Sequence, residues 1–158
     1  MGKQAIILIP EIALTYQTVR YFRNYFGDRV TIINSRLSDG EKYDQFMRAK
    51  NGDVDVVIGP RSALFAPFQN LGIIIIDEEH ETSYKSDYPP KYHARETAVK
   101  RAELEHASVL LGSATPSVES YHRALNGTYR LLELHERAGS GQLAKTSIVD
   151  LRKELKAG

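Results

Sequence analysis

The chain has 158 residues, of which 42% are hydrophobic and 26% charged, which is ordinary for a soluble globular protein and enough for one domain with a substantial core. Its formal net charge of +1 gives no general electrostatic reason to bind nucleic acid or a membrane. The chain contains no cysteine, which excludes disulfides and thiolate zinc sites, and its apolar runs are too short to span a bilayer. A cytoplasmic setting is the default expectation.

Short apolar runs alternate with amphipathic segments along the chain. We expect strands at about 5–9, 29–33, 54–58, 72–76, 108–111 and 129–134, and helices at about 15–26, 38–51, 94–105 and 115–126. Thr15 is placed to cap the first helix, Ser38 and Glu41 form a capping-box pattern before the second, and Thr115 precedes a proline that opens the last. Repeated strand–helix alternation predicts an α/β fold with a parallel sheet flanked by helices.

The most informative segment is Gly72–His80, GIIIIDEEH, in which four isoleucines lead into polar residues. A β-branched apolar run predicts a strand buried on both faces. The carboxylates of Asp77 and Glu78 then lie at the carboxyl end of the strand, where open α/β sheets bind ligands. Such a pair suits Mg²⁺ binding and the activation of water, although a solvated acidic turn would give the same pattern.

Four unusual segments each follow the end of a predicted strand: IPEIALT at 9–15, GPRSALFAPF at 59–68, DEEH at 77–80 and GSATPS at 112–117. In this order and spacing they resemble the first motor lobe of superfamily-2 helicases, most closely the bacterial primosomal replication-restart helicases. The resemblance covers nearly the whole chain, from Gly2 to about Asp150. The stretches that carry it are GKQAIILIPEIALT, RSALFAPFQNLGIIIIDEEH, YHARETAV and LLGSATPSVES. The resemblance implies a RecA-like sheet and an ATP-dependent DNA helicase that moves 3′ to 5′.

The resemblance also implies the roles of the acidic motif. Asp77 would hold Mg²⁺ and Glu78 would orient and deprotonate the attacking water. His80 would sense the nucleotide state, or would merely cap a neighbouring carbonyl. Glu79 is expected to be a turn or surface residue. The coupling motif that follows would be formed by three residues, Ser113, Ala114 and Thr115.

Two further loops are similar to those that touch the phosphate backbone of the tracked strand, which small hydroxyls, backbone amides and an arginine can contact without reading sequence. Arg61 taken alone would more often form a surface salt bridge. The residues concerned are Pro10, Glu11 and Thr15 in the first loop and Gly59, Arg61 and Ser62 in the second.

Residues 82–101 interleave aromatic and basic side chains, a composition suited to stacking on single-stranded bases. The segment resembles an aromatic-rich loop that links DNA binding to ATP hydrolysis, although a tyrosine-containing surface loop is the plainer alternative. The expected DNA-binding residues here are Tyr84, Lys85, Tyr88, Tyr92 and Arg95.

No glycine-rich phosphate loop, GxxxxGKS or GxxxxGKT, occurs in the chain. We therefore expect residues 1–136 to be part of the first motor lobe, 137–158 to be a connector toward a second lobe, and the segment alone to be inactive. The parent would use ATP and Mg²⁺, bind single-stranded or forked DNA, and meet the primosome and single-strand-binding proteins. Without the phosphate-loop strand, strand 108–111 is expected to lie at an exposed edge that favours self-association.

Two alternatives come from other classes of protein. A metal-dependent hydrolase could use Asp77, Glu78, His80 and His93, but it leaves IPEIALT and GSATPS unexplained. A receiver-like signalling module could use Asp77 as phosphoacceptor, but it needs an acidic pair after its first strand and a lysine after its last.

Overall fold

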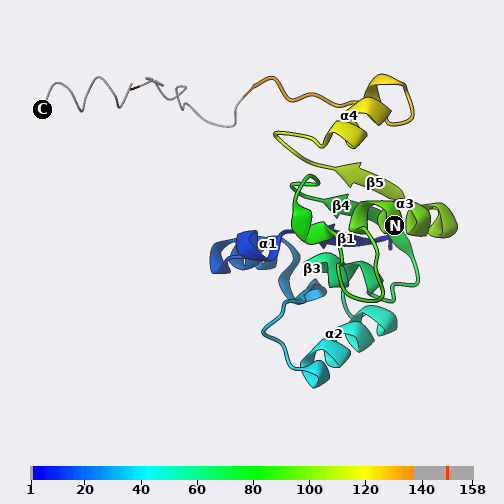
Figure 1. Cartoon of the computed structure of the whole chain (residues 1–158). Coiled ribbons are helices and arrows are strands. Elements are labelled where there is room, and N and C mark those ends of the chain that lie inside the picture. Colours follow the sequence, from blue (N-terminus) through cyan, green and yellow to red (C-terminus); the bar gives the residue numbers. More distant parts are fainter. Residues whose placement is uncertain (1, 137–148, 150–158) are drawn as a thin grey trace, which may run out of the picture.

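The computed structural model describes residues 2–136 and residue 149. Five parallel strands form one sheet in the order β2-β3-β1-β4-β5 (Figure 1). The predicted parallel α/β sheet is therefore confirmed. The strands are β1 (Gln4–Leu8), β2 (Val30–Ile32), β3 (Val56–Gly59), β4 (Leu71–Ile76) and β5 (Ser108–Leu111).

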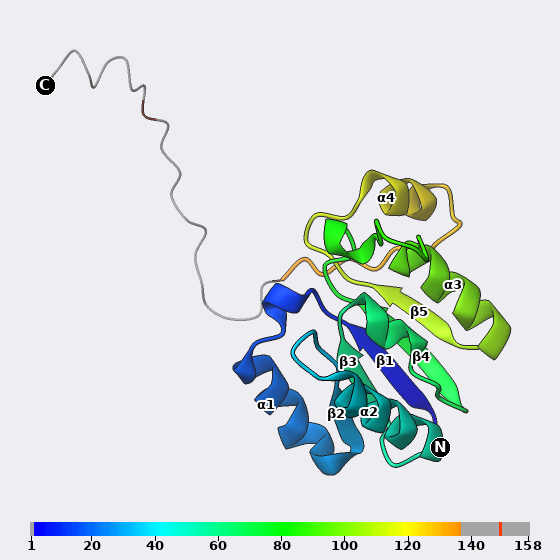
Figure 2. The same cartoon turned by 60° about the horizontal axis from the view of Figure 1, so that its bottom comes forward.

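Helices connect the strands and lie on both sides of the sheet (Figure 2). The helices are α1 (Tyr16–Phe26), α2 (Asp39–Asn51), α3 (Ala94–Glu105) and α4 (Val118–Leu125). Thr15 caps α1, and Ser38 with Glu41 forms the predicted capping box of α2. The predicted start of the last helix is wrong: α4 begins at Val118, because Ser117 and not Thr115 caps it by accepting a hydrogen bond from the Ser120 amide.

Two apolar clusters lie on opposite faces of the sheet. The larger contains Leu8, Ile74 and Ile76 and packs against the alanines of α3 and the end of α2. The smaller contains Ile7 and packs against α1. Side chains alternate between the faces of a strand, so β1 is buried on both sides. The prediction for β4 was only half right, because Ile73 and Ile75, which face the α1 side, are partly exposed.

The expected strand at 129–134 does not form. Residues 129–136 have no regular secondary structure, and Leu132 and Leu134 are exposed. A strand needs a neighbour to pair its backbone groups, and within the described residues none lies beside this segment. The expected connector, 137–158, lies outside the described residues apart from residue 149. Within the described part of the chain, none of the helices is both long and apolar enough to cross a membrane.

β5 is an edge strand, pairing with β4 on one side alone among the described residues. Leu110 in this strand is 42% exposed. Unpaired backbone groups beside an apolar side chain recruit other chains. We therefore expect the 158-residue chain to self-associate in a light-scattering concentration series, and Leu110→Lys to reduce the association. A wild-type chain that stays monomeric at every concentration would contradict this prediction.

Candidate functional site

The predicted motifs meet at one edge of the sheet. Asp77 follows β4, Gly112 follows β5, Pro10 follows Ile9 at the end of β1, and Pro60 follows β3. Because all the strands are parallel, their carboxyl ends lie at the same edge, where α/β sheets bind ligands. The fold thus brings the four unusual sequence segments together.

The acidic pair lies on a tightly held turn. The Asp77 amide donates to the Leu8 carbonyl at 2.9 Å, and the Asp77 carboxylate accepts the Glu78 amide through Oδ1 at 3.1 Å. Glu78 has a φ of 47°, in the left-handed region that non-glycine residues rarely adopt. Backbone strain of this kind persists only where the surroundings enforce it, and it clusters at functional sites. Both carboxylates remain accessible to solvent.

His80 joins the acidic motif to the loop after β5. Its Nδ1 lies 2.7 Å from the Ser113 hydroxyl and 3.6 Å from the Glu78 carboxylate. The Ser113 hydroxyl also accepts the Thr115 amide at 3.0 Å. Ala114 is exposed between them. The two motifs are therefore in direct contact, and Ser117 rather than Thr115 caps the helix that follows.

Glu79 is not the turn or surface residue that we expected from the sequence. Its side chain is 1% exposed, and its carboxylate accepts hydrogen bonds from the Ser117 amide at 2.6 Å and from the Arg95 guanidinium at 2.8 Å. The hydroxyls of Ser117 and Ser120 donate to the same carboxylate. Burial raises the pKa of Glu79, but these hydrogen bonds outweigh it and leave the pKa below its ordinary value. Glu79 is therefore held as a carboxylate.

The tyrosines of the aromatic segment have different surroundings. Tyr84 is 1% exposed and its hydroxyl donates to the Asp77 carbonyl at 2.7 Å, so its ring does not face the solvent as stacking on a base requires. Burial raises the pKa of Tyr84. Tyr92 is half-buried and packs edge-on against Phe65 at 5.2 Å between ring centroids. Tyr88, 80% exposed, is the ring best placed to stack.

The basic residues of this region also differ in whether their side chains are buried or exposed. Arg61 donates to the carbonyls of Ser83 and Lys85, both at 2.8 Å, and so fixes the backbone of the aromatic segment. Arg95 is buried against Glu79. Arg95 is therefore not free to contact phosphate, whereas Arg61 uses Nη1 alone for its two bonds and its contact with phosphate stays a prediction. The Lys85 side chain is exposed. What the sequence did not reveal is that both guanidiniums have partners in distant segments.

The remaining predicted residues mainly shape the loops. Pro10 is buried, and the Glu11 carboxylate accepts the Ser35 amide at 2.8 Å. Hydrogen bonding from the Ser35 side chain and from its amide lowers the pKa of Glu11. Thr15 caps α1. A Cβ at Gly59 would lie 2.5 Å from the Ile33 carbonyl oxygen, so only glycine fits there. Ser62, in contrast, is exposed at the start of the Arg61–Phe65 turn.

The donor set at Asp77 fits Mg²⁺, which is commonly held by one or two carboxylates together with water and substrate phosphates. Gly112 leaves room beside it, since a Cβ there would lie 3.7 Å from Asp77 Oδ1. Within residues 2–136, no three histidine, aspartate or glutamate side chains are placed to hold a metal by themselves. His93 caps α3 instead of joining Asp77. The metal-hydrolase alternative therefore has no support.

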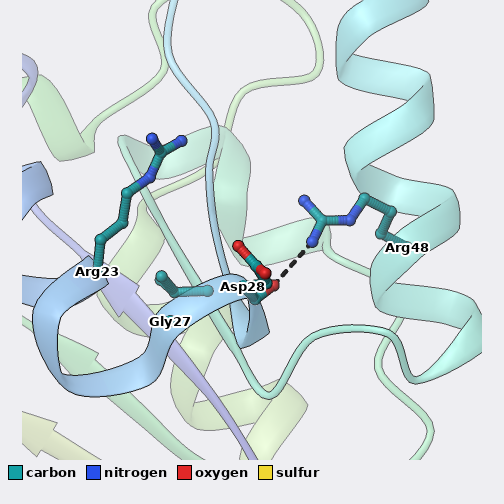
Figure 3. Close-up of a pocket in the computed structure, with 5 residues that line it drawn as sticks. Arg23, Gly27, Asp28 and Arg48 are labelled. Atoms are coloured by element: carbon teal, nitrogen blue, oxygen red, sulfur yellow. Dashed lines mark hydrogen bonds between the residues drawn. The ribbon is translucent and has the colours of Figure 1, made fainter.

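A shallow pocket of about 260 Å³ lies elsewhere, between the end of α1 and α2 (Figure 3). Arg48 points into it and donates to the Asp28 carbonyl at 2.8 Å, while the guanidinium of Arg23 lies apart (Figure 3). Asp28 precedes β2, so the pocket belongs to the amino ends of the strands. It is therefore separate from Asp77 and Glu78.

Comparison with known proteins identifies the class of this chain. Residues 1–124 match the DEAD/DEAH box helicase family, and the chain belongs to that family. A solved structure of the C-terminal domain of Dbp5 from S. cerevisiae, bound to Gle1 and IP6, has a TM-score of 0.53 at 12% identity, and the match covers 80% of this chain and 71% of that one. At this identity the likeness shows the RecA-like fold alone.

Closer relatives in sequence carry one name. The chain is 53% identical to the replication restart protein PriA of Bacillus subtilis over 99% of its length, and 51% identical to that of Chlamydia pneumoniae over 97%. The match to PriA of Synechocystis is 49% identical over 99% of the chain. The chain spans about a fifth of the length of these relatives, with 20% of the Bacillus and Synechocystis proteins and 21% of the Chlamydia protein covered.

Proposed function

We propose that this chain is part of the first motor lobe of an ATP-dependent 3′ to 5′ DNA helicase that restarts stalled replication forks. The observation that carries the proposal is the Asp77–Glu78 turn at the carboxyl end of β4, joined through His80 to Ser113 after β5. Residues 1–136 would belong to the lobe and 137–158 would lead toward the second one. The 42–53% identity to the named PriA relatives supports this reading.

In the parent, Asp77 would hold Mg²⁺, which when bound neutralises charge on the phosphates of ATP. Glu78 would orient the attacking water and accept its proton. The turn holds the Glu78 backbone in a fixed conformation, so the backbone of this residue does not need to be ordered during the reaction. His80, which contacts both Glu78 and Ser113, would report changes at the nucleotide to the loop after β5.

The DNA track would use the exposed groups of the aromatic segment and of the neighbouring loops. Tyr88 would stack on a base, Lys85 would face phosphates, and Ser62 would offer a hydroxyl to the backbone. Tyr84 and Arg61 would position the segment from within. The parent would act in the bacterial cytoplasm on single-stranded or forked DNA, with primosome and single-strand-binding proteins as partners.

Tyr88→Ala in the full-length protein that contains this chain is expected to weaken DNA stimulation of ATP hydrolysis. One lost stack costs about 1–3 kcal/mol, or roughly 5- to 150-fold in the DNA concentration for half-maximal stimulation. Tyr25→Ala is the matched control, because Tyr25 is 71% exposed but lies on α1. Steady-state ATPase assays over a titration of single-stranded DNA measure the effect.

Equal stimulation of the Tyr88 variant and the wild type would remove Tyr88 from the DNA track. A wild-type protein that neither hydrolyses ATP in response to DNA nor separates forked duplexes would overturn the proposed function itself. The two results are distinguished by the wild-type titration.

A further inference from the structure

The carboxylate of Glu79 lies in a buried cluster that connects three separate parts of the fold. It meets Arg95 at the start of α3, and Ser117 and Ser120 at the start of α4. The Arg95 guanidinium reaches the same two hydroxyls, at 2.6 Å and 2.9 Å. Four donors satisfy one carboxylate, and Arg95, with 8% of its side chain exposed, neutralises it.

The cluster lies next to the strained residue of the site. The Glu79 amide donates to the Gly112 carbonyl at 3.0 Å, which fixes the peptide that follows Glu78. On the other side, the Asp77 carbonyl accepts the Tyr84 hydroxyl at 2.7 Å. Glu78 is therefore held in its left-handed conformation by anchored residues on both flanks.

Arg95 also connects this cluster to the aromatic segment. It lies within that segment, where it is the second residue of α3, and its amide donates to the His93 imidazole at 3.2 Å. Arg95 therefore follows closely on the loop that carries Tyr88, and it is bonded to the carboxylate beside Glu78. His80 and Ser113 form a second connection between the two loops, but that one is solvent-accessible.

We propose that Glu79 and Arg95 are positioning residues. They attach the loop that contains Glu78 to the start of α4, which fixes the Glu78 backbone, and they transmit movement of the DNA-facing segment to Glu78. This inference rests on the proposed function. It assigns neither residue a contact with ATP or DNA. If the cluster only stabilised the fold, its loss would destabilise the whole lobe evenly. If it positions Glu78, its loss would alter the surroundings of Glu78 more than the rest of the lobe.

The test uses Glu79→Gln, which keeps the shape of the side chain and removes its charge. Asp55→Asn is the matched control, because the Asp55 carboxylate pairs with Arg29 at the opposite edge of the sheet. In the full-length protein we expect Glu79→Gln to lower kcat at saturating DNA by about tenfold or more, with KM for ATP changed by less than about twofold. Asp55→Asn is expected to leave both values within about twofold.

Hydrogen exchange on the same proteins gives a readout that needs no activity. The amides of residues 78–81 and 117–120 are expected to exchange faster in Glu79→Gln, by a larger factor than those of β1. Uniformly faster exchange across the lobe would overturn the inference in favour of a purely structural role. An unchanged kcat would overturn it as well. If the wild type shows no DNA-dependent ATPase activity, the proposed function fails and the exchange pattern alone decides the inference.

Discussion

Glu78→Gln in the full-length protein is expected to lower kcat for ATP hydrolysis by about 10² to 10⁴-fold, the contribution typical of a general base. The carboxamide keeps the size of the side chain but cannot accept the proton of the attacking water. The turn around Glu78 is held by the Asp77 carboxylate and by Glu79, so the loop should keep its conformation. ATP binding is therefore expected to persist.

Single-turnover hydrolysis and equilibrium binding of a nucleotide analogue measure the two parts of this prediction separately. Glu81→Gln is the matched control, because Glu81 is a neighbouring acid whose amide donates to the Glu78 carbonyl at 2.9 Å. Hydrolysis by the Glu78 variant at the wild-type rate would assign water activation to another group. Loss of analogue binding would show instead that Glu78 shapes the nucleotide site.

Local patterns were sufficient to predict most of the elements. Ser38 and Glu41 form their capping box within four residues of each other, and the isoleucine run of β4 needs no distant information to be read as a strand. The order of motifs at strand ends also predicted which loops would meet, because parallel strands place them at one edge.

Surroundings supplied by distant residues could not be predicted. Glu79 is buried where Ser117, 38 positions later, brings a helix amino terminus to its carboxylate. Tyr84 and Arg95 are residue types expected in a DNA-binding segment. Each side chain is instead buried and bonds to a partner that the local sequence does not specify. The serine at position 117, directly before α4, was the one local sign, since serine is a preferred N-cap residue. Even the apolar run at 129–134 stays irregular, because none of the strands within residues 2–136 pairs with it.

The buried cluster should also govern the stability of this chain. Arg95→Met is expected to lower the free energy of unfolding by about 3–5 kcal/mol, because it leaves the Glu79 carboxylate buried without its counter-charge. The double substitution Glu79→Gln with Arg95→Met should recover most of this loss. The remaining amide is uncharged. Its oxygen, in the position of Glu79 Oε1, can still accept the Ser117 amide, and its NH2 group, in the position of Oε2, can donate to the two serine hydroxyls.

Urea unfolding of the 158-residue chain followed by circular dichroism measures these differences. Arg29→Met removes the guanidinium of an exposed pair at the other end of the sheet and should change the midpoint only slightly. A similar loss in Arg95→Met and in the double variant would show that the guanidinium contributes by packing. A free energy of unfolding that is higher in the double variant than in Arg95→Met would show that the cost comes from the unpaired charge of Glu79. These two variants differ only at position 79, where the double variant has lost that charge.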